Sequence, residues 1–190
     1  SLSPTEASHT NSSISMNDRH QSFLFSAITY GFSMVCQELD EGNPKAKGHP
    51  ACHFFPALLA EAERNETYSG TQILEAFIIG YEINVRAGAA ITLKKDIHPH
   101  GSWGLIGGGY AFGKLNNYTS EEYDSMLALT SSLPFISLWN PIFEGEQIRD
   151  LMIGLNNLHL LLLPAMVNSG ISSSQKNLET IYSSILGNSV

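Results

Sequence analysis

A chain of 190 residues, 43% of them hydrophobic, is long and apolar enough to bury one sizeable core, which excludes a disordered or fibrous protein. The formal net charge of −8 at pH 7 argues against a nucleic-acid-binding surface. Two cysteines, Cys36 and Cys52, are too few to suggest a disulfide framework, so we expect a cytoplasmic protein.

The sequence predicts neither a signal peptide nor a membrane span. The N-terminus lacks the basic-then-apolar order of a secretion signal, and residues 1–17 are rich in Ser, Thr and Asn, which predicts a flexible arm. The longest apolar run, residues 158–167, is interrupted by His159 and Pro164 and is too short to cross a bilayer. We therefore expect residues 18–190 to form a single all-helical domain without a membrane partner.

Apolar residues recur at helical spacing through most of the chain, and no period-two run of useful length indicates a strand. Residues 69–72 and 119–122 have the spacing of capping boxes, which mark helix starts. The predicted helices cover residues 18–39, 50–64, 70–91, about 98–115, 120–130, 146–170 and 175–186. This pattern predicts an all-α fold, a bundle of six or seven helices joined by short loops.

Residues 97–115 are the stretch around which the rest of the chain is organised. Small residues recur there and allow another backbone to pack closely: Gly101, Gly104, Gly107, Gly108, Gly109, Ala111 and Gly113. The glycines lack the Lys-Ser/Thr of a phosphate-binding loop. In the helix expected here, a His-x-His spacing places His98 and His100 on different faces, so this pair does not predict a metal site. The alternative to a functional role is that His98 and His100 are surface residues at the start of a helix.

The loop between the first two predicted helices concentrates functional groups. Gly42 and Pro44 end the first helix. The ten positions 40–49 offer carboxylates, an amide, lysines and an imidazole: Asp40, Glu41, Asn43, Lys45, Lys47 and His49. Loops held by rigid elements commonly carry catalysis, so we consider a site here; a solvated connection is the alternative.

Three segments carry a family resemblance. Residues 38–51 contain E-L-D-E-G-N and G-H-P-A, residues 97–104 read I-H-P-H-G-S-W-G, and residues 143–151 read F-E-G-E-Q-I-R-D-L. In this order and at these separations they resemble the MmgE/PrpD family, which includes 2-methylcitrate dehydratase and cis-aconitate decarboxylase. The resemblance covers roughly residues 20–170.

The resemblance implies an architecture and a set of site residues. Family members combine a large helical domain with a smaller α+β lid, are cofactor-free and commonly form homodimers. Relatives are more than twice as long as this chain, so we expect it to correspond to the helical domain only, without the lid. The resemblance further implies catalytic roles for His49 and His98 and substrate binding by Asp40, Asn43 and Arg149.

The residue chemistry agrees with a lyase. Eliminating water from a citrate-like acid needs a base for the proton alpha to a carboxylate, an acid for the leaving hydroxyl and cations for the carboxylates. His49 and His98 suit the first two tasks, and Arg149 with Lys45 or Lys47 suits the third. We expect a dehydratase or decarboxylase of a small di- or tricarboxylic acid; a dicarboxylate epimerase or racemase and a truncated, non-catalytic dimerisation module are the alternatives.

Overall fold

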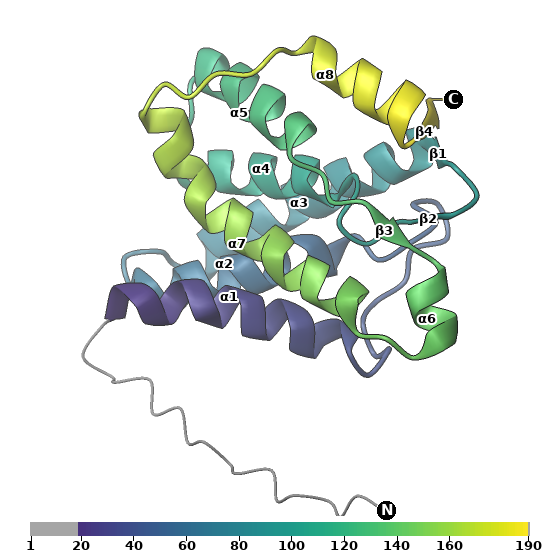
Figure 1. Cartoon of the computed structure of the whole chain (residues 1–190). Helices are drawn as coiled ribbons and strands as arrows, with labels where there is room; N and C mark the ends of the chain where they lie inside the picture. Colours follow the sequence, from purple (N-terminus) through teal and green to yellow (C-terminus); the bar gives the residue numbers. More distant parts are fainter. Residues whose placement is uncertain (1–18, 190) are drawn as a thin grey trace, which may run out of the picture.

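The computed structural model describes residues 19–189, so the flexible arm predicted for residues 1–17 lies outside the described residues. The all-α prediction is confirmed, because helices make up most of the described chain (Figure 1). The elements in chain order are α1 (Arg19–Val35), the 3-10 helix η1 (Ala51–His53), α2 (Phe55–Arg64), α3 (Gly70–Ala90), β1 (Ile91–Leu93), β2 (Ile97–His98), α4 (Gly104–Leu115), α5 (Ser120–Ser132), β3 (Ser137–Leu138), α6 (Asn140–Glu144), α7 (Ile148–Asn168), α8 (Lys176–Glu179), the π-helix η2 (Thr180–Ile185) and β4 (Gly187–Ser189).

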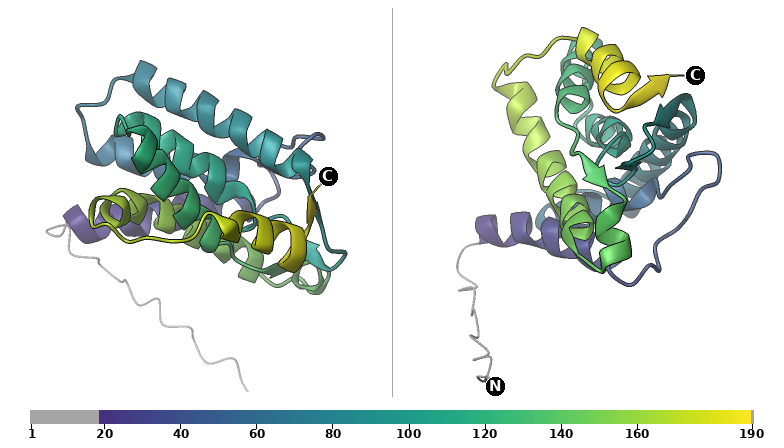
Figure 2. Two further views of the ribbon diagram at one scale, coloured as in Figure 1. Left: turned by 90° about the horizontal axis from the view of Figure 1, so that it is seen from above. Right: turned by 45° about the vertical axis from the view of Figure 1, so that its right-hand side comes forward.

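Helix α4 lies in the middle of the bundle, as expected for a close-packed central helix. It contacts α3, α5 and α7, while α1 lies along α7 and also contacts α2 (Figures 1 and 2). Every residue of α4 except Tyr110 and Lys114 is buried. The core around it is apolar and includes Phe54, Leu58 and Phe112. The candidate site described below is therefore attached to the most deeply buried helix.

The small residues of α4 bring it to within backbone contact of α3. A Cβ atom at Gly107 would lie 2.2 Å from the carbonyl oxygen of Gly80, so only glycine fits. The fully buried Asn84 side chain fastens this contact: its Nδ2 donates to the carbonyl oxygens of Gly104 (3.0 Å) and Pro50 (3.1 Å), and its Oδ1 accepts from the Gly107 N–H (2.8 Å). One amide thus joins α3, the start of α4 and the segment before η1.

Both predicted capping boxes are present. The Ser69 hydroxyl accepts from the Gln72 N–H and the Gln72 side chain accepts from the Ser69 N–H, so α3 begins at the predicted residue. Thr119 and Glu122 make the same reciprocal pair at the start of α5. Each box satisfies backbone N–H groups that have no partner inside the first turn of a helix.

The prediction of one continuous helix over residues 50–64 is wrong. A 3-10 turn ends at His53, Phe54 leaves helical geometry with φ −147°, and α2 begins at Phe55. Pro56 explains the break, because a proline inside a continuous helix lacks the N–H and clashes with the carbonyl four residues before it. In the first turn of α2 it costs nothing. The first helix likewise ends at Val35 rather than Leu39.

Two short strand pairs were not predicted. β1 pairs antiparallel with β4, and β2 pairs antiparallel with β3, placing His98 opposite Ser137. Strands of two or three residues are too short to show the alternation by which a strand is recognised in a sequence. The second pair matters for the site, because it fixes the backbone of His98.

Helix α7 is the one helix among the described residues that is long and apolar enough to cross a membrane. Half of its most apolar window is buried inside the protein, where it packs against α1, α2 and α4. A core helix passes the same test of length and composition, so α7 is weak evidence for a membrane span.

The contact between α3 and α4 makes a stability prediction. Gly107→Ala should destabilise the chain by about 1–3 kcal/mol or more, because the added methyl overlaps the Gly80 carbonyl oxygen and the two helices must move apart. Gly70→Ala is the matched control: nothing lies within 4 Å of its Cβ position in the first turn of α3, and alanine favours a helix. Urea unfolding of both variants measures the difference; equal midpoints would contradict backbone contact as the reason for Gly107.

Candidate active site

An open cleft of about 420 Å³ lies where the loop after α1 meets the segments that contain β2 and β3. His49 enters it from the loop, and His98 enters it from β2. The lining residues are Gly42, Asn43, Pro44, Lys47, Gly48, His49, His98, Pro99 and Trp139. The two histidines, separated by 49 positions in the sequence, therefore line one cavity.

The loop is shaped by Asn43. Its Oδ1 accepts hydrogen bonds from the N–H groups of Lys45 (3.0 Å) and Ala46 (3.2 Å), and its Nδ2 donates to the Tyr81 hydroxyl (3.2 Å). The Asn43 N–H also donates to the Gly48 carbonyl oxygen at 2.9 Å. Asn43 lies in the cleft wall, and its contacts within the protein hold the loop in a tight turn.

His49 is paired with a buried carboxylate. Its Nδ1 lies 2.7 Å from the Glu41 carbonyl oxygen and 3.0 Å from Oδ2 of Asp40, whose side chain is only 1% exposed. Hydrogen bonding to Asp40 and the negative charge of Asp40 outweigh burial and raise the pKa of His49. The Nδ1 hydrogen points into the protein, so Nε2 is the nitrogen of His49 that can exchange a proton with a ligand.

His98 has the opposite electrostatic state. Burial, together with the neighbouring His53 and His49, lowers its pKa to about 4, so the ring is neutral at pH 7. The N–H of His100 donates to Nδ1 of His98 at 3.1 Å, which leaves the ring hydrogen on Nε2. Trp139 packs edge-on against His98 with ring centroids 4.3 Å apart. His98 is therefore a neutral hydrogen-bond donor in the cleft wall.

The expectation that His98 and His100 lie on different faces is wrong. Their ring centroids are 4.5 Å apart. The expectation holds for a helix, but α4 begins only at Gly104; His98 lies in the strand β2, and the chain turns at Pro99 directly after it. His100 is 1% exposed, and neither of its ring nitrogens has a hydrogen-bond partner. Burial lowers its pKa well below the ordinary value, so it too is neutral.

His53 positions both halves of the cleft. It is fully buried, and its Nδ1 donates to the His49 carbonyl oxygen at 2.9 Å. Its Nε2 accepts from the Gly101 N–H at 3.2 Å. A Cβ atom at Gly104 would lie 2.0 Å from the His53 ring, which explains the glycine at the start of α4. The one feature of the sequence that points to this role is that His53 follows His49 by four residues.

Arg149 lies outside the cleft lining, at the start of α7. Its guanidinium forms an ion pair with Glu38, and its Nε lies 3.4 Å from Oδ1 of Asp150. The Arg149 side chain is buried, and the carboxylates of Glu38 and Asp150 compensate its positive charge. The structure thus brings His49, His98 and Asn43 into one cleft, with Asp40 paired to His49, whereas Arg149 is absent from the cleft lining and is paired with Glu38.

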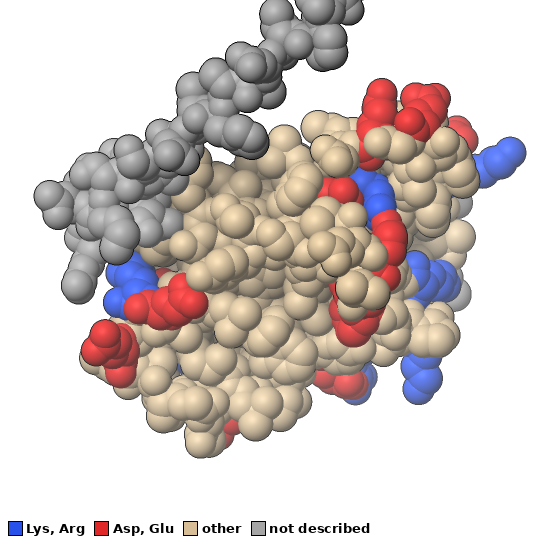
Figure 3. All heavy atoms as spheres, turned by 90° about the horizontal axis from the view of Figure 1, so that it is seen from below, with Lys and Arg blue, Asp and Glu red and all other residues tan. Residues whose placement is uncertain are grey.

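Cationic side chains are few around the cleft. Lys47 lines it and donates to the Ile91 carbonyl oxygen at 3.4 Å, and the exposed Lys45 lies on the same loop. Glu41 is half-buried and accepts from the Ala51 N–H, and burial raises its pKa to about 7. On the face shown in Figure 3, lysine and arginine are interspersed with aspartate and glutamate at the rim and do not gather into a basic patch.

A match over residues 2–139 to the model of the MmgE/PrpD N-terminal domain covers both histidine segments of the cleft. The chain belongs to the MmgE/PrpD family. It is also similar to cis-aconitate decarboxylase from Aspergillus terreus, with 30% identity over 170 residues, or 84% of this chain and 34% of that protein. A second cis-aconitate decarboxylase, from Aspergillus terreus strain NIH 2624 / FGSC A1156, is 31% identical over 111 residues, or 54% of this chain and 23% of that protein.

The family membership predicted from three motifs is confirmed, and the chain spans about a third of the length of the first of these relatives. The fold agrees with an all-helical N-terminal domain of the MmgE/PrpD family. The roles of individual residues are not decided by these similarities. They rest on the geometry of the cleft.

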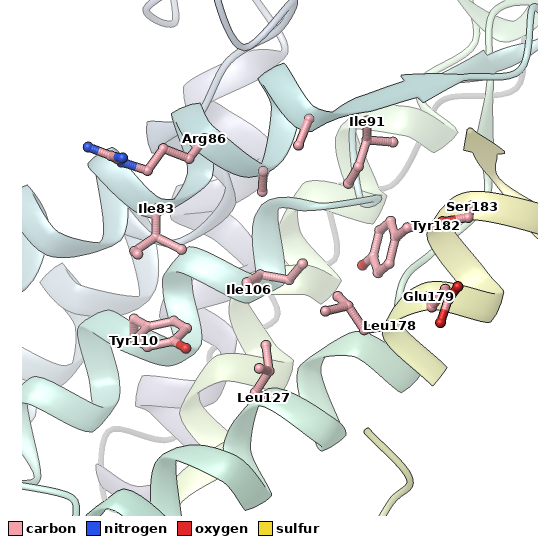
Figure 4. Close-up of a pocket in the computed structure, with 12 residues that line it drawn as sticks. Ile83, Arg86, Ile91, Ile106, Tyr110, Leu127, Leu178, Glu179, Tyr182 and Ser183 are labelled. Carbon is pink, nitrogen blue, oxygen red and sulfur yellow. The ribbon is translucent and has the colours of Figure 1, made fainter. Parts of the chain in front are cut away.

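A second cavity, of about 580 Å³, lies between α3, α4, α5 and the C-terminal helical segment (Figure 4). It is larger than the histidine cleft, but its walls are mostly apolar, including Ile83, Ile106 and Leu127. The one arginine there, Arg86, is paired with Glu82 four residues earlier in α3. This MmgE/PrpD chain therefore concentrates its proton-exchanging groups in the smaller cleft.

The two histidines of the cleft should titrate in opposite directions from the ordinary value of 6.5. In the presence of EDTA, NMR titration of the ring signals should give a pKa above 6.5 for His49 and about 4 for His98. Asp40→Asn should lower the pKa of His49, because the main interaction with the charged ring is lost.

The raised pKa of His49 also determines how the stability of the folded protein depends on pH. Because folding raises the pKa of His49, the His49–Asp40 pair contributes fully below pH 6.5 and is lost as the pH rises through the folded value. An unchanged His49 pKa in the Asp40→Asn variant would contradict the pairing.

Proposed function

We propose that this cleft is the proton-transfer centre of a lyase, a dehydratase or decarboxylase, that acts on a small di- or tricarboxylic acid such as 2-methylcitrate or cis-aconitate. The observation that supports the proposal is a pair of histidines in one cleft with opposite electrostatic states: His49 with Asp40 behind it, and the neutral His98. Pairs of titratable groups whose surroundings separate their pKa values commonly divide acid and base work.

His49 is the group that moves a proton. In a dehydration, Nε2 of the neutral ring takes the proton alpha to a carboxylate, the C–O bond breaks, and the proton held by His49 leaves with the hydroxide as water. In a decarboxylation the protonated ring gives a proton to the carbon while the C–C bond breaks and carbon dioxide departs. Asp40 stabilises the protonated ring in both directions, since its Oδ2 lies 3.0 Å from Nδ1.

His98 has a different task from His49. A neutral imidazole does not readily release its remaining proton, but its Nε2–H donates a strong hydrogen bond to a carboxylate oxygen on which charge develops. The low pKa of His98, about 4, keeps it in this form across the neutral range. Lys47 and the protonated His49 supply the positive charge among the residues of the cleft, and Asn43 holds their loop.

Turnover assays test the assignment. The chain is incubated with 2-methylcitrate or cis-aconitate, and the products are measured by mass spectrometry. His49→Gln should reduce turnover by about 10²–10⁴-fold, the usual contribution of a general acid or base. His159→Gln is the matched control, a half-buried histidine of α7 that is absent from the cleft lining. Full activity in His49→Gln would remove His49 from the mechanism.

The alternatives give other results in the same assay. Deuterium incorporation into the acid without loss of water or carbon dioxide indicates an epimerase or racemase. Acid-induced NMR shifts at His49 and His98 without turnover indicate a binding module that needs further protein to act, which matters because the chain spans about a third of its first relative. The homodimer, the cytoplasmic location and the absence of a cofactor stay predictions.

A further inference from the structure

A third, smaller cavity adjoins the histidine cleft. It has a volume of about 210 Å³, and its walls come from the loop before η1, from β1 with the turn after it, and from the residue before α6. Its lining includes Lys47, Lys94 and Lys95, and we call it the lysine hollow. Lys47, Pro99 and Trp139 line both the lysine hollow and the histidine cleft, so the two cavities meet at these residues.

The lysine hollow gathers positive charge that no carboxylate compensates. In the described part of the chain, four cationic side chains form ion pairs with Asp or Glu: Arg64, Arg86, Lys114 and Arg149. None of the ion pairs found among the described residues includes Lys47, Lys94 or Lys95, and no described Asp or Glu lines either cavity. A hollow lined by one sign of charge attracts anions, even in a chain with a net charge of −8.

The lysines keep hydrogens for a ligand. Nζ of Lys47 donates to the Ile91 carbonyl oxygen at 3.4 Å, and Nζ of Lys94 donates to the Ser184 carbonyl oxygen at 2.8 Å. An ammonium group has three hydrogens, so each of these two has hydrogens left after its contact with the protein. Lys95 is exposed and makes no such contact within the described chain. All three can therefore donate to an anionic oxygen.

The backbone holds two of these lysines in fixed positions. Lys47 has φ 56°, a left-handed conformation that side-chain-bearing residues rarely adopt, and the Asn43 N–H closes its turn by donating to the Gly48 carbonyl oxygen at 2.9 Å. The carbonyl oxygen of Lys94 accepts from the Ile97 N–H at 2.9 Å and closes the turn after β1. Little ordering of the chain is then needed when an anion binds, which favours affinity.

We propose that the lysine hollow binds the carboxylate at the far end of an acid whose reacting end lies in the histidine cleft. This inference rests on the proposed function, because it takes the cleft as the place of reaction. Hydrogen bonds from ammonium groups to a carboxylate are stronger than those between neutral groups. An acid with one carboxylate cannot occupy both cavities with a charged group, so the hollow selects di- and tricarboxylic acids. It supplies the positive charge that was expected from Arg149.

Tryptophan fluorescence reads this binding directly, because the two tryptophans of the sequence, Trp103 and Trp139, both line the lysine hollow. The whole chain is titrated at pH 7 and constant ionic strength with tricarballylate, a tricarboxylic acid without a hydroxyl to eliminate. Butyrate and inorganic phosphate are titrated in parallel, and calorimetry repeats each titration. Tricarballylate should bind at least about 10-fold more tightly than butyrate, because it makes a second charge-assisted contact. It should also bind more tightly than phosphate, which reaches one cavity only.

Variants locate the contact. Lys94→Gln and Lys95→Gln should each weaken tricarballylate binding by about 3–10-fold, as expected for charged contacts near the surface. Lys176→Gln is the matched control, because it removes the same charge from α8, outside the lining of both cavities. Circular dichroism checks that each variant folds, and Lys95→Gln alone decides if Lys94→Gln does not fold, because Lys95 makes no side-chain contact that the fold needs.

Three results would overturn the proposal: no tricarballylate binding by either method, phosphate binding as tight as that of tricarballylate, or an effect of Lys95→Gln no larger than that of Lys176→Gln. The proposed lyase activity can fail separately. A chain that binds tricarballylate through these lysines but converts no acid refutes the activity and supports the hollow. A chain that converts an acid with the same KM before and after Lys95→Gln refutes the hollow alone.

Discussion

The cleft depends on one buried imidazole. His53 donates to the His49 carbonyl oxygen through Nδ1 and accepts from the Gly101 N–H through Nε2, so it joins the loop after α1 to the turn after β2. Burial lowers its pKa to about 4, which keeps the ring neutral and allows one nitrogen to donate while the other accepts. A protonated ring would present two hydrogens and break the contact with Gly101. The distance between the two walls of the cleft therefore rests on His53 remaining uncharged.

Four histidines share this small region, and their surroundings give them different states. Asp40 favours the charged form of His49, whereas burial and the neighbouring rings favour the neutral forms of His53, His98 and His100. Like charges this close repel one another, so only the ring that has a carboxylate beside it gains a proton easily. The region can hold one positive charge at a chosen place, which is useful for a site that handles anionic acids.

The all-α fold and the starts of α3 and α5 follow from local signals in the sequence, because capping boxes and helical spacing act over a few residues. The meeting of His49 with His98 was predicted from the family resemblance, and no local pattern reveals it. The contact between His98 and His100 was missed because a helix was expected over both residues, whereas α4 begins only at Gly104 and a short strand and a turn precede it. The ion pair of Arg149 with Glu38 joins residues more than a hundred positions apart, and no local pattern in either segment predicts it.

The glycines of α4 that face α3 determine how rigidly the site is held. Where two helices meet through long side chains, the spacing between their axes can relax as those side chains change rotamer. At Gly107 a hydrogen atom faces the Gly80 carbonyl oxygen, and neither group has a torsion that can yield. Van der Waals contact between these two backbone groups therefore sets the separation of α3 and α4. Asn84 joins these helices to the segments that carry the two walls of the cleft. Those segments are therefore held rigidly as well.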